Sequence, residues 1–279
     1  DTGRYTFNAV ERGDPSDEPV ILLHGFPETS YMWRRMQDLL ADNGYYTLAP
    51  DQRGYSPGAR PSRIRDYDIA ALAEDVIAIA DSMGLESFHL IGHDWGSAVA
   101  WYVAWQHPDR IRSLTAMSVP HLEAFRIALT TDPLQYEASS YMRLFRWPVL
   151  PEIFLRSRNF RNMRAIWEES TDEEIARYMD VFRDRGAVRA ALNWYRANYR
   201  SLTGSNVALC PVKVPTLFLW GTGDPAILKT GAELNKEYVS GSYSEYFLDA
   251  GHWLVQESFS QVSAKILDHL NRWRLSGRE

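Results

Sequence analysis

Continuous apolar runs alternate with segments of helical periodicity along the first half of the chain. Residues 19–23, Pro-Val-Ile-Leu-Leu, form an uninterrupted apolar run of the kind that is buried on both faces of a parallel sheet. Further strands are predicted at residues 5–12, 45–49, 87–91 and 113–119, and helices at 33–43, 69–83 and 97–106. Strands that alternate with helices in this way predict an α/β fold with a mostly parallel central sheet.

This alternation stops after Pro120 and resumes near residue 213. The residues between are helical in pattern, aromatic and rich in arginine, with prolines that break the pattern. Two more strands are then predicted at 214–220 and 244–248, followed by an amphipathic helix at 254–273. We therefore expect an α/β core made of residues 1–120 and 213–279, with a helical cap of residues 121–212 inserted into it.

The run Gly92-His93-Asp94-Trp95-Gly96 lies between a predicted strand and a predicted helix. A strand that turns sharply into a helix needs small residues two before and two after its apex, and the two glycines meet that need. Asp94 therefore occupies the apex of a nucleophile elbow, where serine is the common residue. A carboxylate is ionised at neutral pH and needs no base to attack. Attack on a carbonyl would give an unstable anhydride, whereas attack on an sp³ carbon gives an ester that water can open.

A second segment, Gly54-Tyr55-Ser56-Pro57-Gly58, has the letter pattern of a serine elbow. The residue after such a nucleophile must give its backbone N–H to the oxyanion hole, and Pro57 has none. No strand-to-helix context surrounds the segment either, since Pro61 follows soon after. We interpret it as a loop.

Asp224 and His252 each follow a predicted strand in the second part of the core. The order nucleophile, acid, histidine is that of α/β-hydrolases. The strand that precedes the expected cap ends at Pro120 without a carboxylate, which leaves Asp224 as the candidate acid. His252 follows a glycine, whereas His89 lies within an apolar run. Asp94, Asp224 and His252 are the predicted catalytic triad.

Charge and cysteine content narrow the possible partners. A net charge of −6 argues against nucleic acid, because nucleic-acid binding surfaces are usually basic. The basic run at 156–164 is interpreted as a solvated helix face, since acidic residues follow it directly. Cys210 is the only cysteine, so no internal disulfide can form and a cytoplasmic setting is favoured. No apolar run reaches membrane-spanning length and no signal peptide is recognised, so we expect no membrane partner. A monomer and a homodimer both stay open.

With these motifs the chain resembles the α/β-hydrolase superfamily, and more closely its epoxide hydrolases, over nearly its whole length. The matching segments are His24-Gly25-Phe26-Pro27, Gly92 to Gly96, Asp224 before Pro225, and Gly251-His252-Trp253. The resemblance implies that the backbone N–H groups of Phe26 and Trp95 form the oxyanion hole.

The resemblance also selects two of the five tyrosines in the expected cap. Tyr141 lies in one stretch that matches the family, and Tyr195 lies in the other, Leu192-Asn-Trp-Tyr-Arg196. Periodicity alone does not choose among Tyr136, Tyr141, Tyr178, Tyr195 and Tyr199. Opening an epoxide releases a strongly basic alkoxide, and a phenol with a pKa near 10 can protonate it while staying protonated at neutral pH.

The resemblance therefore implies an epoxide hydrolase that forms a vicinal diol, with a role in detoxification, water as second reactant and neither cofactor nor metal. An aromatic content of 13% favours a small apolar epoxide. A haloalkane dehalogenase ranks second. Those enzymes bind the departing halide with side-chain N–H donors, typically an Asn and a Trp, and this chain has the Trp but carries Phe26 where the Asn would be. A fluoroacetate-type dehalogenase ranks third, since Trp95 replaces the Arg expected there. A non-catalytic ligand-binding homologue is the alternative that is not an enzyme. Such a protein would not need the nucleophile, acid, histidine and tyrosine pair that this chain carries.

Overall fold

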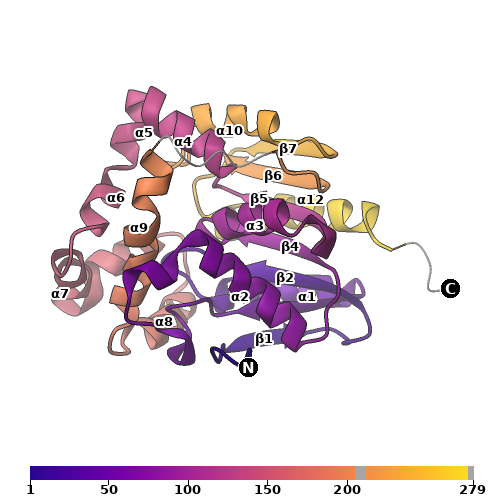
Figure 1. The fold of residues 1–279 in the computed structure, drawn as a ribbon, viewed down its shortest axis with the longest axis horizontal. Coiled ribbons are helices and arrows are strands. Elements are labelled where there is room, and N and C mark those ends of the chain that lie inside the picture. The colour runs from indigo at the N-terminus through magenta and orange to yellow at the C-terminus, as the bar shows by residue number, and fades with distance from the viewer. Residues whose placement is uncertain (205–210, 276–279) are drawn as a thin grey trace.

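The computed structural model of the chain describes residues 1–204 and 211–275. Within them, seven strands form one sheet of order β1-β3-β2-β4-β5-β6-β7 (Figure 1). β1 pairs with β3 in antiparallel orientation, and the other neighbours are parallel. The strands are β1 (Ala9–Arg12), β2 (Glu18–Leu23), β3 (Tyr45–Pro50), β4 (Phe88–His93), β5 (Ile111–Met117), β6 (Thr216–Gly221) and β7 (Tyr243–Leu248). The predicted α/β fold with a mostly parallel sheet is confirmed.

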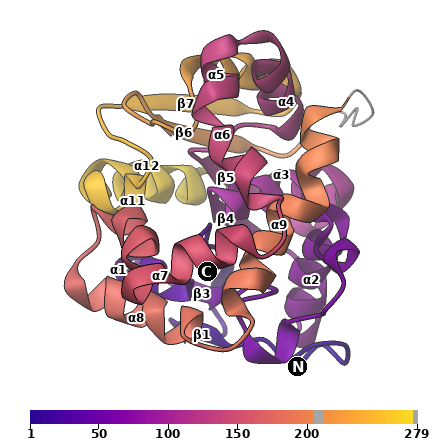
Figure 2. The ribbon, with the colours of Figure 1, turned by 90° about the vertical axis from the view of Figure 1, so that its left-hand side faces the viewer.

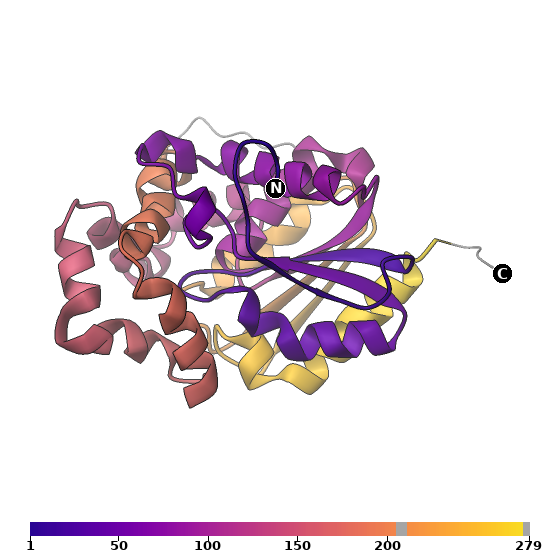
Figure 3. The ribbon, with the colours of Figure 1, turned by 90° about the horizontal axis from the view of Figure 1, so that it is seen from below.

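Helices cover both faces of the sheet. Figure 3 shows α1 (Arg34–Asp42) and α12 (Phe259–Arg272) on one face, with α2 (Ile69–Ser82) and α3 (Trp95–Gln106) on the other. The apolar run at 20–23 is fully buried, because the strand that contains it has helices on both sides. The loops that carry Asp94, Asp224 and His252 follow the carboxyl ends of strands in this sheet, so the buried sheet sets their positions.

The helices between β5 and β6 gather beside one end of the sheet (Figures 1 and 2). They are α4 (Leu122–Thr131), α5 (Pro133–Ala138), α6 (Ser140–Phe145), α7 (Leu150–Arg164), α8 (Asp172–Phe182) and α9 (Ala187–Thr203), while α10 (Lys229–Leu234) packs against α4. Two buried polar side chains tie α9 to the core. The Trp194 indole donates to the Arg53 carbonyl at 2.8 Å, and Asn198 accepts from the Ile69 N–H at 2.8 Å. α9 is therefore held in a fixed position above the sheet.

Most predicted elements agree with the structure to within two residues, but two predictions were wrong in part. The strand predicted at 5–12 is formed only from Ala9 onward, because the Asn8 N–H bonds to the Ser56 hydroxyl instead of a neighbouring strand. The helix predicted at 254–273 is broken at Ser258 into α11 (Leu254–Glu257) and α12. The Glu257 carboxylate turns back and accepts from the N–H groups of Gly251 and Trp253, so this break serves the loop that carries His252.

The basic segment at 156–164 is not one regular helix. Residues 158–160 have φ values of 50°, 55° and 62°, in the left-handed region, and they separate two helical parts of α7. Its arginines at 156, 158 and 161 are exposed, as the interpretation of a solvated face requires. None of the helices in the described part of the chain is both long enough and apolar enough to cross a membrane. Cys210 lies outside the described residues.

A charge cluster closes the opposite end of the sheet. Glu18 accepts hydrogen bonds from Arg112 at 2.6 Å and from the ring of fully buried His89 at 3.0 Å. Burial alone would raise the pKa of Glu18, but these two partners outweigh it and lower the pKa to about 2. Glu18 therefore stays ionised, far from the strand ends that carry the triad residues.

Candidate active site

Asp94 lies at a sharp turn between β4 and α3. Its φ of 52° is in the left-handed region, which non-glycine residues rarely adopt. A Cβ added to Gly96 would lie 2.1 Å from the Leu23 carbonyl oxygen, and one added to Gly92 would lie 2.3 Å from the Gly96 carbonyl oxygen. Only glycine fits at both places, as the elbow interpretation requires.

Two backbone N–H groups hold the Asp94 carboxylate. The Phe26 N–H donates to Oδ1 at 2.7 Å, and the Trp95 N–H also donates to this carboxylate. Gly25 allows the close approach, because a Cβ there would lie 2.3 Å from the Asp94 Cβ. Burial alone raises the pKa of Asp94, but the hydrogen bond and charge of His252 outweigh burial and keep the pKa below its usual value. Asp94 is therefore ionised.

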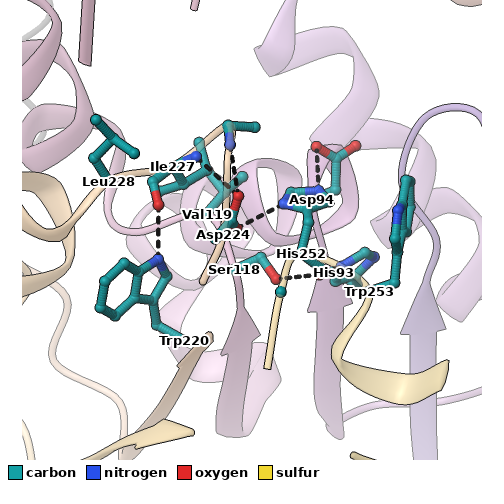
Figure 4. Close-up of polar contacts among 12 residues, drawn as sticks. His93, Asp94, Ser118, Val119, Trp220, Asp224, Ile227, Leu228, His252 and Trp253 are labelled. Atoms are coloured by element: carbon teal, nitrogen blue, oxygen red, sulfur yellow. Dashed lines mark hydrogen bonds and ion pairs between the residues drawn. The ribbon is translucent and has the colours of Figure 1, made fainter. Parts of the chain in front are cut away.

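His252 stands between two carboxylates (Figure 4). Its Nδ1 lies 2.7 Å from Asp224 Oδ2, and its Nε2 lies 3.5 Å from Asp94 Oδ2. Asp224 is itself fixed, because its Oδ1 accepts from the N–H groups of Ala226 at 2.8 Å and Ile227 at 3.0 Å. Burial lowers the pKa of His252, but the charges of Asp224 and Asp94 outweigh it and raise the pKa well above its ordinary value. The imidazolium therefore sits beside an ionised nucleophile.

Two phenols face Asp94 across a narrow, mainly apolar cavity of about 30 Å³. Tyr141 comes from α6 and Tyr195 from α9, and their ring centroids are 6.0 Å apart. Burial, and then the negative charge of Asp94, raise the pKa of both phenols far above the ordinary value. Both therefore stay protonated and can act as hydrogen-bond donors.

The other tyrosines of this region do not line that cavity. Tyr178 donates to Glu28 at 3.2 Å, Tyr136 is exposed, and Tyr199 lies under the guanidinium of Arg146 at 4.7 Å from its ring centroid. The structure thus brings together with Asp94 the two tyrosines that the family resemblance selected.

A buried polar network next to the triad was missed by the sequence reasoning. Glu28 is fully buried, and its Oε1 accepts from Gln256 at 2.6 Å. Its Oε2 lies 3.3 Å from His93 Nδ1, while His93 Nε2 lies 2.8 Å from the His252 carbonyl oxygen. Glu28 directly follows the motif that ends at Pro27, and His93 lies within the motif from Gly92 to Gly96, but periodicity assigns no role to either.

The serine of the discarded pattern is not available as a nucleophile. Ser56 is fully buried, its hydroxyl donates to the Asp51 carbonyl at 2.6 Å, and it accepts from the Asn8 N–H at 2.9 Å. Residues 57–59 form a 3-10 turn, not the α-helix that follows an elbow. Within residues 1–204 and 211–275, no group of three or more His, Cys, Asp or Glu side chains is arranged to hold a metal ion.

Comparison with known proteins places the chain in a family. Residues 18–258 match the family model of the alpha/beta hydrolase fold. The chain is 34% identical to epoxide hydrolase A of Mycobacterium tuberculosis, over 97% of this chain and 95% of that protein. It is 33% identical to epoxide hydrolase 3 of Xenopus tropicalis, over 95% of this chain and 74% of that protein. The chain belongs to the epoxide hydrolase family of α/β-hydrolases.

Solved structures of epoxide hydrolases share its architecture. An inhibitor complex of the epoxide hydrolase from Bacillus megaterium aligns with a TM-score of 0.87 and 27% identity, over 95% of this chain and 96% of that one. Epoxide hydrolase A from Mycobacterium thermoresistibile aligns with a TM-score of 0.81 and 32% identity, over 95% and 94%. Membership of the epoxide hydrolase family confirms the resemblance drawn from the motifs.

Proposed function

We propose that this epoxide hydrolase opens epoxides to vicinal diols through a covalent ester on Asp94. The observation that carries the proposal is the surroundings of that carboxylate. The Phe26 N–H donates to Oδ1 of Asp94, His252 lies beside Oδ2, and the Tyr141 and Tyr195 phenols line the same cavity. A serine-type triad does not need two phenols, whereas the alkoxide formed when an epoxide opens needs a proton donor, and the phenols can serve as that donor.

In the first half-reaction, the Asp94 oxygen beside His252 attacks an epoxide carbon. A carbon–oxygen bond to Asp94 forms as the epoxide carbon–oxygen bond breaks. The electron pair goes to the epoxide oxygen, which takes a proton from Tyr141 or Tyr195. Both phenols are buried and have raised pKa values, so they donate hydrogen bonds to this oxygen before the proton moves.

In the second half-reaction, neutral His252 removes a proton from water as the water attacks the Asp94 ester carbonyl. The bond between that carbonyl carbon and the ester oxygen that carries the substrate then breaks, the departing diol oxygen takes the proton of the new carboxylic acid, and Asp94 is ionised again beside protonated His252. The N–H groups of Phe26 and Trp95 stabilise the oxyanion, and a positioned donor of this kind contributes about 10²–10³ in rate. Ester formation also removes the Asp94 charge, one of the two that raise the pKa of His252. The loss of that charge lowers the pKa of His252, so the imidazolium gives up its proton to restore the phenol that was deprotonated in the first half-reaction, and the neutral ring can act as a base.

The helices between β5 and β6 supply the substrate side of the cavity. We infer that residues 121–212 act as a cap on the core of residues 1–120 and 213–279. Apolar side chains from both parts line the cavity, which favours a small apolar epoxide: Val119, Leu122, Phe125, Met142, Leu202 and Ile227. A cytoplasmic location, supported by the single cysteine, and a role in detoxification complete the proposal.

Trapping the ester tests this function. His252→Gln removes the base but leaves Asp94, so incubation with styrene oxide should give a protein heavier by one substrate, with the added mass on the peptide that contains Asp94. Asp94→Asn/His252→Gln is the matched control and should gain no mass. Slow diol formation by His252→Gln with no adduct at any time would rule out the proposed role of His252.

A further inference from the structure

Exposed apolar side chains gather on one short segment of the described chain. Six of the thirteen large apolar side chains exposed in residues 1–204 and 211–275 lie between 144 and 154, and each is 42% to 62% exposed. They are Leu144, Trp147, Val149, Leu150, Ile153 and Phe154, which we call the apolar ridge. Single exposed apolar residues are normal on a protein surface, but a contiguous group marks a surface that binds something apolar.

Contacts with α9 hold the backbone of the apolar ridge in place. It spans the end of α6 and the start of α7, at the outer edge of the helices and away from the sheet (Figures 1 and 3). Arg196 of α9, whose side chain is only 5% exposed, donates to the Trp147 carbonyl at 2.7 Å and pairs with Glu152 at 2.8 Å. The ridge side chains are therefore exposed although their backbone is tied to the helix that carries Tyr195.

The charge around the apolar ridge is opposite in sign to that of the whole chain. Residues 143–164 contain six arginines and one glutamate, whereas the chain carries a net charge of −6. The single glutamate, Glu152, is already paired with Arg196. Arg156 and Arg189 border a shallow depression together with Val149 and Ile153. This surface thus presents apolar side chains with arginines at their border, which fits a partner that is both apolar and anionic.

We propose that the apolar ridge and its arginines dock the protein on an anionic phospholipid bilayer. Apolar and tryptophan side chains enter the boundary between headgroups and acyl chains, while arginines pair with the headgroups. A second copy of the chain fits less well, because a two-fold contact through this face would bring two sets of arginines together. Such docking is distinct from a membrane span, and it amends the expectation that a membrane is no partner.

Docking would place the active-site cavity close to apolar substrate that is dissolved in the bilayer. Leu144 of the apolar ridge lies on α6, three residues after Tyr141, so the helix that carries one proposed proton donor faces the lipid surface. Apolar epoxides concentrate in bilayers, so a docked enzyme meets them there. This consequence rests on the proposed function, whereas the binding itself does not and can be measured without any epoxide.

Sedimentation with vesicles tests the docking. Vesicles of phosphatidylcholine mixed with an equal amount of phosphatidylglycerol should carry the wild type to the pellet, and pure phosphatidylcholine vesicles should carry far less. Leu150→Ser/Phe154→Ser should weaken binding by about tenfold for each side chain, since each loses apolar burial. Ile64→Ser/Leu134→Ser, which changes exposed residues outside the apolar ridge, is the matched control and should bind as wild type does.

A charge variant separates the electrostatic part. Each arginine near an anionic surface contributes about fivefold to binding, so Arg156→Gln/Arg189→Gln, at the two arginines that border the same depression as Val149 and Ile153, should bind roughly 25-fold more weakly, and added salt should weaken the wild type more than this variant. Wild type that stays in the supernatant with anionic vesicles would overturn the proposal, and so would ridge variants that bind as tightly as wild type. A dimer in light scattering that Leu150→Ser/Phe154→Ser dissociates, with no vesicle binding, would assign this face to a second copy.

Discussion

Removing the two phenols one at a time, and then together, separates epoxide opening from halide release. Tyr141 and Tyr195 are buried in one cavity, so water cannot readily replace a lost hydroxyl. Each single Phe variant keeps one donor for the epoxide oxygen. General acid catalysis contributes about 10²–10⁴, so each single variant should slow alkylation by about 10–10³, and the double variant should lose nearly all epoxide opening.

The assay compares an epoxide with a bromoalkane of similar size. Rapid quench of wild type and variants gives the rate at which the Asp94 ester forms from each substrate. Bromide takes no proton when it leaves, so the phenol substitutions should matter little for its release. Tyr199→Phe is the matched control, because Tyr199 lies on α9 as Tyr195 does, but its ring lies under Arg146 and does not line the cavity at Asp94. This variant should change neither rate by more than about twofold.

Three results would refute this reasoning. If wild type releases bromide faster than it opens the epoxide, and the double Tyr variant leaves bromide release unchanged, the chain is a haloalkane dehalogenase. If wild type consumes neither substrate but binds both, the non-catalytic alternative holds. An epoxide rate that stays unchanged in the double variant would show that Tyr141 and Tyr195 are not the proton donors.

Three further variants test the fold and the second half-reaction. Gly25→Ala should push the Asp94 carboxylate from its place and lower kcat by about 10² or more, with an unchanged circular dichroism spectrum. The pKa of Glu18 is about 2 in the folded protein against an ordinary 4.5, so its stabilisation is present above pH 4.5 and is lost as pH falls toward 2. The urea midpoint of Glu18→Gln should accordingly vary less over that range than that of wild type. Asp224→Asn should slow hydrolysis of the alkyl-enzyme by about 10⁴ because His252 loses its orientation, and rapid quench should show the ester accumulating.

The sequence was most informative where a local rule leaves few choices. Buried parallel strands read as continuous apolar runs, and a sharp turn with crowded backbone demands glycine, so the sheet and the elbow at Asp94 could be predicted from residues alone. Asp224 and His252 followed because the carboxyl ends of parallel strands share one sheet edge.

Other features depend on contacts between distant segments, which periodicity does not report. Tyr141 and Tyr195 could be chosen among five tyrosines only through the family resemblance, since their meeting with Asp94 depends on how α6 and α9 pack. Glu28 reaches Gln256 across 228 positions of sequence, and no local signal marks that bond. The break at Ser258 was likewise missed, because the helical pattern continues through it while Glu257 turns back to the loop of His252.

The most direct test of the covalent route through Asp94 follows oxygen through one turnover. Enzyme in excess over epoxide is mixed in heavy-oxygen water, the reaction is stopped after a single turnover, and the diol and the Asp94 peptide are analysed by mass spectrometry. We expect an unlabelled diol, because its new oxygen comes from the carboxylate, and label in Asp94, because water replaces that oxygen. Label in the diol with none in Asp94 would mean that water attacks the epoxide directly, and the covalent route would be wrong.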